Sequence, residues 1–177
     1  MKIIISVDPS MTNMGFCVAK VNDDNTLKIE YCKTFDFTNK ESSAEFYYSG
    51  ILWLRSYADD IIALPYEYNP FGNNIIQRGQ HRAVGFIQGL IFAEGLKFPV
   101  VAINSSHVKA VFGNGRATKE ETIAKVKARY GIECDEHSAD AISIAYCYWQ
   151  DYQEKERIKQ VKKQQKKLKL LKTRDKK

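Results

Sequence analysis

The sequence lacks a long apolar run, a cysteine pair and a secretory signal. None of its hydrophobic stretches approaches the roughly 20 residues that a membrane-spanning helix needs. The few apolar residues before Asp8 are too short for the core of a signal peptide. The four cysteines are widely separated and form no C-x-x-C pair, which argues against a zinc ribbon or a thioredoxin-like site. We therefore expect a cytoplasmic protein with free thiols.

Outside its C-terminal end, the sequence also has no excess of positive charge. Residues 153–177 hold 12 Lys/Arg against 3 Asp/Glu, and the rest holds 15 against 18. With 177 residues, 44% of them hydrophobic, the chain suits one domain with a real core, which we place at residues 1–152. Residues 153–177 then form a basic tail, which we expect to be helical. Such a tail commonly binds nucleic acid, and the alternatives are a solvated helix or a membrane-surface helix.

Hydrophobic periodicity predicts alternating strands and helices. Ile3–Val7 is a continuous β-branched run typical of a central strand, and two further strands, Gly15–Ala19 and Leu27–Tyr31, would complete an antiparallel meander. The remaining elements are predicted in this order: a helix at 41–64 closed by Pro65, a strand at 66–68, a helix at 76–96, a strand at 99–103, a short helix at 104–111, a helix from the capping box Thr118–Glu121 to Gly131, and a last helix from His137 or Ser138. The order predicts an α/β fold with a mixed sheet flanked by helices.

Acidic residues stand at the ends of two of these strands. Asp8 follows a strand with no other charge, and Glu67 lies at the end of another. Asp140 and His137 are three residues apart on the last helix and therefore share a face. Such a cluster suits phosphodiester cleavage, because carboxylates bind Mg²⁺ and two metal ions about 4 Å apart stabilise the attacking and leaving oxygens. Taken singly, each acid could equally be a turn residue, a surface charge or a helix-start charge.

Four segments, in this order and spacing, resemble the motifs of RuvC-type Holliday junction resolvases, in the compact form that phages carry. They are Asp8–Gly15, Tyr66-Glu67, the basic segment Val108–Lys119, and His137–Ala141. The resemblance covers roughly residues 2–150. It implies an RNase H-like fold with a five-stranded mixed sheet, a homodimer, and paired nicking of four-way junctions and other branched DNA. If a phage encodes the chain, its location is the host cell cytoplasm.

The resemblance also implies roles for individual residues. Asp8, Glu67 and Asp140 would be catalytic, metal-binding carboxylates for Mg²⁺, and His137 would stand where many members have an Asp. Two departures from the family pattern are Pro9, in place of the usual glycine, and His137 itself, since an imidazole suits Mn²⁺ better than Mg²⁺. Asp135 or Glu136 could supply the missing oxygen instead.

Several residues are candidates for DNA contacts. Phe71 matches in position a family aromatic that approaches the junction centre, although a loop residue folded onto the core is an equal alternative. Arg78 and Arg82 share a helical stripe with His81. Lys109, Arg116 and Lys119 cluster near a glycine-containing loop. Both basic sets would contact phosphates rather than read bases, and a solvated face is the alternative for each.

Two other functions fit parts of the pattern. His137 and Pro9 are compatible with a branched-DNA-binding protein that has lost cleavage. An acid-led turn before a Thr/Gly strand also begins the phosphate-binding loop of actin-like ATPases. Against an ATPase stand the short chain, which leaves no second lobe, and the lack of a Gly-rich adenosine motif. We expect neither a small-molecule substrate nor a membrane partner.

Overall fold

The computed structural model of the chain describes residues 1–10, 12–70 and 74–174. Its elements are, in chain order, β1 (Lys2–Asp8), β2 (Asn13–Val21), β3 (Leu27–Asp36), α1 (Lys40–Ser56), β4 (Ile61–Tyr68), α2 (Asn74–Ala93), β5 (Val100–Asn104), α3 (Ser105–Phe112), α4 (Lys119–Tyr130) and α5 (Glu136–Arg174). The order confirms the predicted α/β class. Among the described residues, no helix is both long enough and apolar enough to cross a membrane.

The five strands form one mixed sheet in the order β3-β2-β1-β4-β5. β1, β2 and β3 pair antiparallel, as the predicted meander requires, whereas β1 pairs with β4 and β4 with β5 in parallel. β1 therefore lies in the centre, and Ile3, Ile4 and Ile5 are fully buried. Because β1 and β4 are parallel, their carboxyl ends meet at the same edge of the sheet, and each of these ends carries one of the predicted acids.

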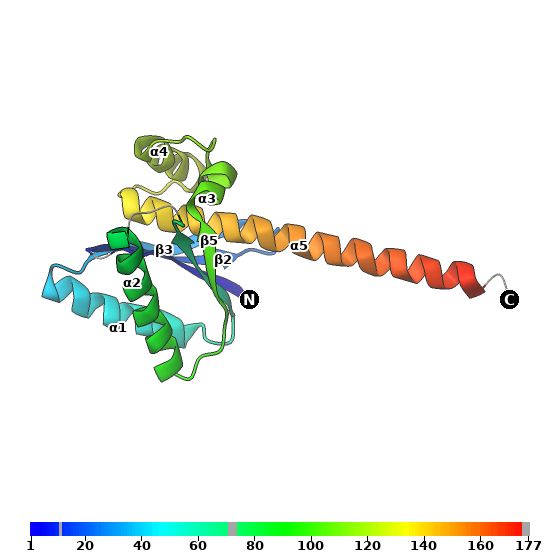
Figure 1. Cartoon of the computed structure of the whole chain (residues 1–177), viewed down its shortest axis with the longest axis horizontal. Helices are drawn as coiled ribbons and strands as arrows, with labels where there is room; N and C mark the ends of the chain where they lie inside the picture. The colour runs from blue at the N-terminus through cyan, green and yellow to red at the C-terminus, as the bar shows by residue number, and fades with distance from the viewer. Residues whose placement is uncertain (11, 71–73, 175–177) are drawn as a thin grey trace. The chain divides into compact units, whose positions relative to one another are not determined.

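Helices cover both faces of the sheet within residues 1–147, which form one compact unit (Figure 1). α1 and α2 lie on one face, and α3, α4 and the first turns of α5 lie on the other. The residues from Tyr148 onward form a second unit, which contains the remainder of α5.

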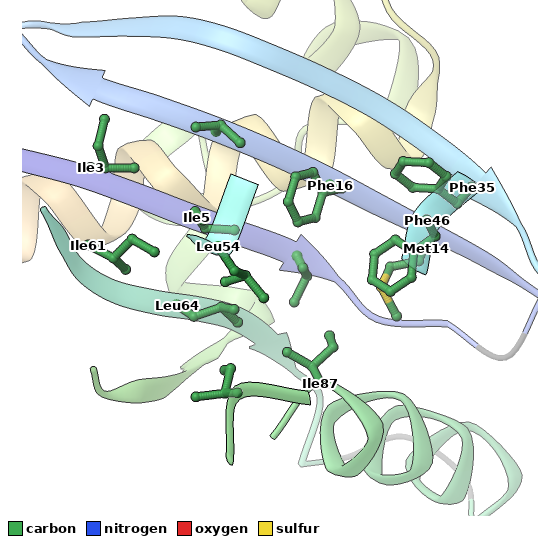
Figure 2. Packing of buried hydrophobic residues seen from close by; sticks show 13 residues of the cluster. Ile3, Ile5, Met14, Phe16, Phe35, Phe46, Leu54, Ile61, Leu64 and Ile87 are labelled. Carbon is green, nitrogen blue, oxygen red and sulfur yellow. The ribbon is translucent and has the colours of Figure 1, made fainter. Parts of the chain in front are cut away.

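The main core lies between the sheet and the pair α1 and α2. Figure 2 shows Ile3 and Ile5 of β1 facing Leu54 of α1 and Ile87 of α2. Next to them, the rings of Phe16, Phe35 and Phe46 meet edge to face with centroids 5.1–6.2 Å apart. Each fully buried large apolar side chain contributes about 1.5–3 kcal/mol. This packing makes the strands a rigid base for the residues at their ends.

The predicted helix at 41–64 is wrong in its second half. α1 ends at Ser56, and Ile61 already belongs to β4, where it pairs with Ile3. Pro65 does not close the segment but lies inside β4, paired with Val101. A residue before proline is disfavoured in the helical conformation, so the apolar run that ends at Pro65 extends as a buried strand.

The predicted helix ends agree better with the structure. Thr118 and Glu121 form both halves of the capping box of α4, and Gly131 ends that helix in the left-handed conformation with φ 69°. α5 begins at Glu136, slightly before the predicted start, because Asp135 accepts a hydrogen bond from the Ser138 backbone N–H at 2.9 Å and so caps the helix. No disulfide joins the four cysteines, all of which lie in the described part of the chain.

Candidate active site

The contact between Asp8 and His137 joins the end of β1 to the start of α5. Side chains alternate along β1, so that Val7 faces the main core while Ser6 and Asp8 face α5. The Ser6 hydroxyl donates to the Ala141 carbonyl at 2.6 Å, and His137 Nδ1 lies 2.8 Å from Asp8 Oδ2. His137 and Ala141 are one turn apart on α5. Their partners, Asp8 and Ser6, are two residues apart on the same face of β1. These two bonds set where α5 lies along β1.

A glycine allows the helix to come this close. Gly15 pairs with Asp8 across the sheet, and a Cβ atom at Gly15 would lie 1.9 Å from the His137 carbonyl oxygen. Thr34, the partner of Gly15 on β3, donates its hydroxyl hydrogen to Asp135 Oδ1 at 2.5 Å. The first turn of α5 thus lies over the row Asp8, Gly15 and Thr34 and is held at both ends of that row.

Glu67 and Asp140 complete a cluster of carboxylates with Asp8. The parallel register pairs Tyr66 with Val7, which places Glu67 beside Asp8. Burial, followed by the negative charges of Asp8 and Asp140, raises the pKa of Glu67 to about 7. Burial, followed by the charges of Asp8 and Glu136, raises the pKa of Asp140 to about 6. Asp140 lines one groove with Glu67, which lies beside Asp8, so the negative charges of the three carboxylates oppose one another's ionisation.

Two basic side chains, Lys109 and His137, lie beside these acids. Lys109 of α3 lines one groove with Glu67 and Asp140, and its charge lowers the pKa of both acids. The hydrogen bond to Asp8 raises the pKa of His137, against the opposing effect of partial burial. The cluster still contains more acids than positive groups. This donor set of three carboxylates and one imidazole fits a divalent cation, for which carboxylate oxygens are the preferred hard ligands.

The three candidates for the fourth ligand have different contacts. Asp135 is occupied as the cap of α5 and as the acceptor of Thr34, and Glu136 forms an ion pair with Lys119. His137 is the one in direct contact with Asp8. Since Asp8 engages its Nδ1 atom, Nε2 is the ring nitrogen that remains to bind an ion.

The residues predicted to contact DNA lie in different parts of the fold. Arg78 and Arg82 are exposed on α2, where they line a hollow with Asn74, Gln77 and His81. Lys109 lies at the carboxylate cluster, and the exposed Arg116 lies in the loop before α4. Lys119, by contrast, is paired with Glu136, so its charge is partly compensated. Phe71 lies outside the described residues.

The residues that position the site were not predictable as such, although Asp135 was named as a possible ligand. Ser6, Thr34 and the cap Asp135 act through contacts with α5, and their types alone do not indicate such a role. Gly15 did carry a signal, because an isolated glycine in a strand often marks the close approach of another backbone.

No protein-family model and no curated protein matches the sequence. Solved structures similar to the chain include two of RuvC and one of Ydc2. Thermus thermophilus RuvC in complex with a Holliday junction substrate has 23% sequence identity and a TM-score of 0.65, over 83% of this chain and 92% of that one. A second T. thermophilus RuvC structure has 24% identity and a TM-score of 0.62, over 82% and 92%. The yeast mitochondrial Holliday junction resolvase Ydc2 has 13% identity and a TM-score of 0.57, over 85% and 81%. The predicted resemblance is thus confirmed at the level of the fold: over most of its length, this chain has the fold of RuvC-type Holliday junction resolvases.

Proposed function

We propose that the chain is a structure-selective, metal-dependent endonuclease that resolves four-way and other branched DNA. The observation that carries the proposal is the convergence of Asp8, Glu67, Asp140 and His137 at one edge of a sheet with the RuvC fold. The similar structures support it further, since two of them are described as Holliday junction resolvases or as bound to that substrate. The reaction would be that of a crossover junction endodeoxyribonuclease.

The side chains divide the chemical work. Asp8, Glu67 and Asp140 hold the metal through their carboxylates, and His137 completes the set through Nε2. When bound, Mg²⁺ or Mn²⁺ polarises the phosphate and lowers the pKa of a water molecule. Because the pKa values of Glu67 and Asp140 are raised, both acids must lose protons before they can bind a cation well. Lys109, beside them, stabilises the additional negative charge that develops on the phosphate.

The surroundings of the cluster suit a DNA backbone. Arg78 and Arg82 on α2, and Arg116 before α4, are exposed and would contact phosphates of the bound DNA. We assign Lys119 a weaker contribution, because binding DNA would compete with its ion pair to Glu136. These contacts position the substrate without reading much sequence.

A homodimer would bring two such clusters to the two opposed strands of a junction. α2 offers a suitable surface, because Gly85, Gly89 and Phe92 follow one face at positions i, i+4 and i+7. Phe92 is 87% exposed, and a Cβ at either glycine would meet nothing within 4 Å. The two glycines leave room for a second helix to approach closely, and the Phe92 ring would be buried in that contact. We propose that two copies pack through this face.

The test is cleavage of a labelled four-way junction and of the linear duplex, in Mg²⁺ and in Mn²⁺. We expect symmetric nicks in the junction only, and their loss by at least 100-fold in Asp140→Asn, which keeps the shape of the side chain but removes its charge. Asp59→Asn is the matched control, because the exposed Asp59 lies away from the site. A higher rate in Mn²⁺ than in Mg²⁺ would support His137 as a ligand.

The same experiment separates the alternatives. Tight junction binding without cleavage in either metal would favour the non-catalytic DNA-binding protein, and the assignment of the carboxylates would be wrong. ATP hydrolysis that Asp140→Asn abolishes, without nuclease activity, would favour the ATPase instead.

A further inference from the structure

The basic segment at the end of α5 changes character along its length. In its first two turns, acids and bases neutralise each other: Arg157 pairs with Glu154 at 2.8 Å and Lys159 with Glu156 at 2.6 Å. After Glu156 there is no acid before position 175, while lysines and Arg174 continue to the end of the helix. The net positive charge is therefore concentrated in the last four to five turns of α5.

Four lysines in this stretch have no partner within the described part of the chain. Lys162, Lys163, Lys166 and Lys167 are exposed, and no ion pair or hydrogen bond engages them. Lys162 and Lys166 are one turn apart, as are Lys163 and Lys167, so like charges face each other along the helix. Such pairs destabilise an isolated helix, and a polyanion alongside would relieve the repulsion.

We propose that residues 158–174 of α5 are a DNA-binding arm that lies against the phosphate backbone of duplex DNA. The inference rests on the proposed function only in taking DNA as the substrate. A helix that carries lysines on every turn and no acids is complementary to a regular row of phosphates. The arm would hold the duplex without regard to its sequence or to the presence of a branch.

The exposed side chains favour DNA over a lipid surface or a second helix. The apolar residues of the arm are outnumbered by its seven lysines and Arg174 and form only a thin stripe; they are Ile158, Val161, Leu168, Leu170 and Leu171. A helix that lies in a membrane interface has a broad apolar face with Trp, Phe or Leu beside its lysines. A coiled-coil seam needs an apolar repeat over several heptads, whereas position 165, where the next seam residue would fall, is Gln.

The experiment measures DNA binding by the full-length protein as a function of salt, in EDTA so that no cleavage occurs. The variant replaces four residues together: Lys162→Gln, Lys163→Gln, Lys166→Gln and Lys167→Gln. We expect the slope of log K against log salt to fall by about 2–4, since each phosphate contact contributes about 0.9. Linear duplex and four-way junction should show the same decrease. The matched control replaces the same four residues by Arg and should retain the wild-type slope.

The outcomes distinguish a DNA-binding arm from a membrane-binding or self-associating helix. An unchanged slope would overturn the proposal. The proposal would also be overturned if the variant bound DNA like the wild type and lost only its sedimentation with phosphatidylserine vesicles. The same holds if it lost only its self-association in sedimentation velocity. Circular dichroism should show unchanged helicity, because all four positions are exposed. Cleavage at low salt should persist in the variant; if the wild type cleaves nothing, the proposed function fails while the salt slope still tests the arm.

Discussion

At the scale of single residues, the carboxylate cluster lowers the stability of the metal-free protein. Glu67 has a folded pKa of about 7, above its usual value, so ionising it is less favourable in the folded than in the unfolded chain. Below its unfolded pKa the acid is protonated in both states and has no such effect. As the pH rises from the unfolded pKa to the folded pKa, the free energy of unfolding falls, and above the folded pKa the loss is complete. The cation that the site is proposed to bind would restore this stability.

Glu67→Gln should therefore stabilise the metal-free protein while it removes activity. In EDTA at pH 8 we expect a gain of about 2 kcal/mol, or about 4–8 °C in Tm, and no gain at pH 4. With Mg²⁺ or Mn²⁺ the wild type should gain stability and the variant much less. Thermal unfolding between pH 4 and 8.5, with and without metal, measures both effects.

Glu133→Gln is the control for this prediction, since Glu133 is 75% exposed. Its Tm should follow that of the wild type within about 1 °C at every pH. A Glu67→Gln variant that is less stable than the wild type at pH 8 would show that Glu67 stabilises the folded state and that the repulsion inferred for the cluster is wrong.

At the scale of elements, the position of α5 over the sheet decides whether the cluster forms. His137 and Asp140 reach Asp8 and Glu67 only if the first turn of α5 lies against β2, and Gly15 leaves the space for that turn. The neighbour that a side chain would meet there is backbone rather than the end of a flexible side chain. The helix as a whole would have to shift.

Gly15→Ala should consequently reduce cleavage by about 100-fold, because a displacement of about 1 Å is enough to misplace catalytic groups. It should also cost about 1–3 kcal/mol of stability through overpacking. Gly50→Ala in α1 is the matched control: its Cβ would meet the Phe46 ring at an ordinary 3.9 Å, and it should gain about 0.5–1 kcal/mol. Cleavage rates and Tm of both variants provide the test. Near-normal cleavage by Gly15→Ala would mean that the placement of α5 tolerates change.

Elements that depend on local chemistry could be predicted from the sequence. Thr118 and Glu121 cap α4 because their own side chains and backbone supply the bonds, and Ile3–Val7 is buried because it is apolar without interruption. The segment before Pro65 was assigned wrongly because its apolar residues fit a helical period about as well as a buried strand. Only its pairing with β1 and β5 distinguishes the two.

The candidate site was predictable in part for the same reason. Asp8 and Glu67 stand out as acids at the ends of apolar strands, and His137 with Asp140 as a pair on one helix face. The ion pair of Lys119 with Glu136 could not be predicted, because it joins two helices whose relative placement depends on the whole fold. The hydrogen bond from Thr34 to Asp135 could not be predicted either, because the two residues are about a hundred positions apart in the chain.

At the scale of the whole molecule, the proposed reaction needs two sites that act together. A four-way junction has approximate two-fold symmetry, and a two-fold dimer would present one cluster to each of two opposed strands. A single copy could nick one strand but would have no second site in register for the other. The geometry of the dimer, rather than the chemistry of each cluster, would then decide whether a junction is resolved.

Phe92→Asp should separate nicking from resolution, because it places a charge within the proposed dimer face on α2. Sedimentation velocity should show a monomer where the wild type is a dimer, and a cruciform plasmid should yield nicked circles in place of linear product. Phe92→Leu keeps an apolar side chain and should remain dimeric. The folded state should be unaffected, since Phe92 is 87% exposed in the single chain. A Phe92→Asp variant that is still dimeric and still linearises the plasmid would require the two copies to meet through another surface.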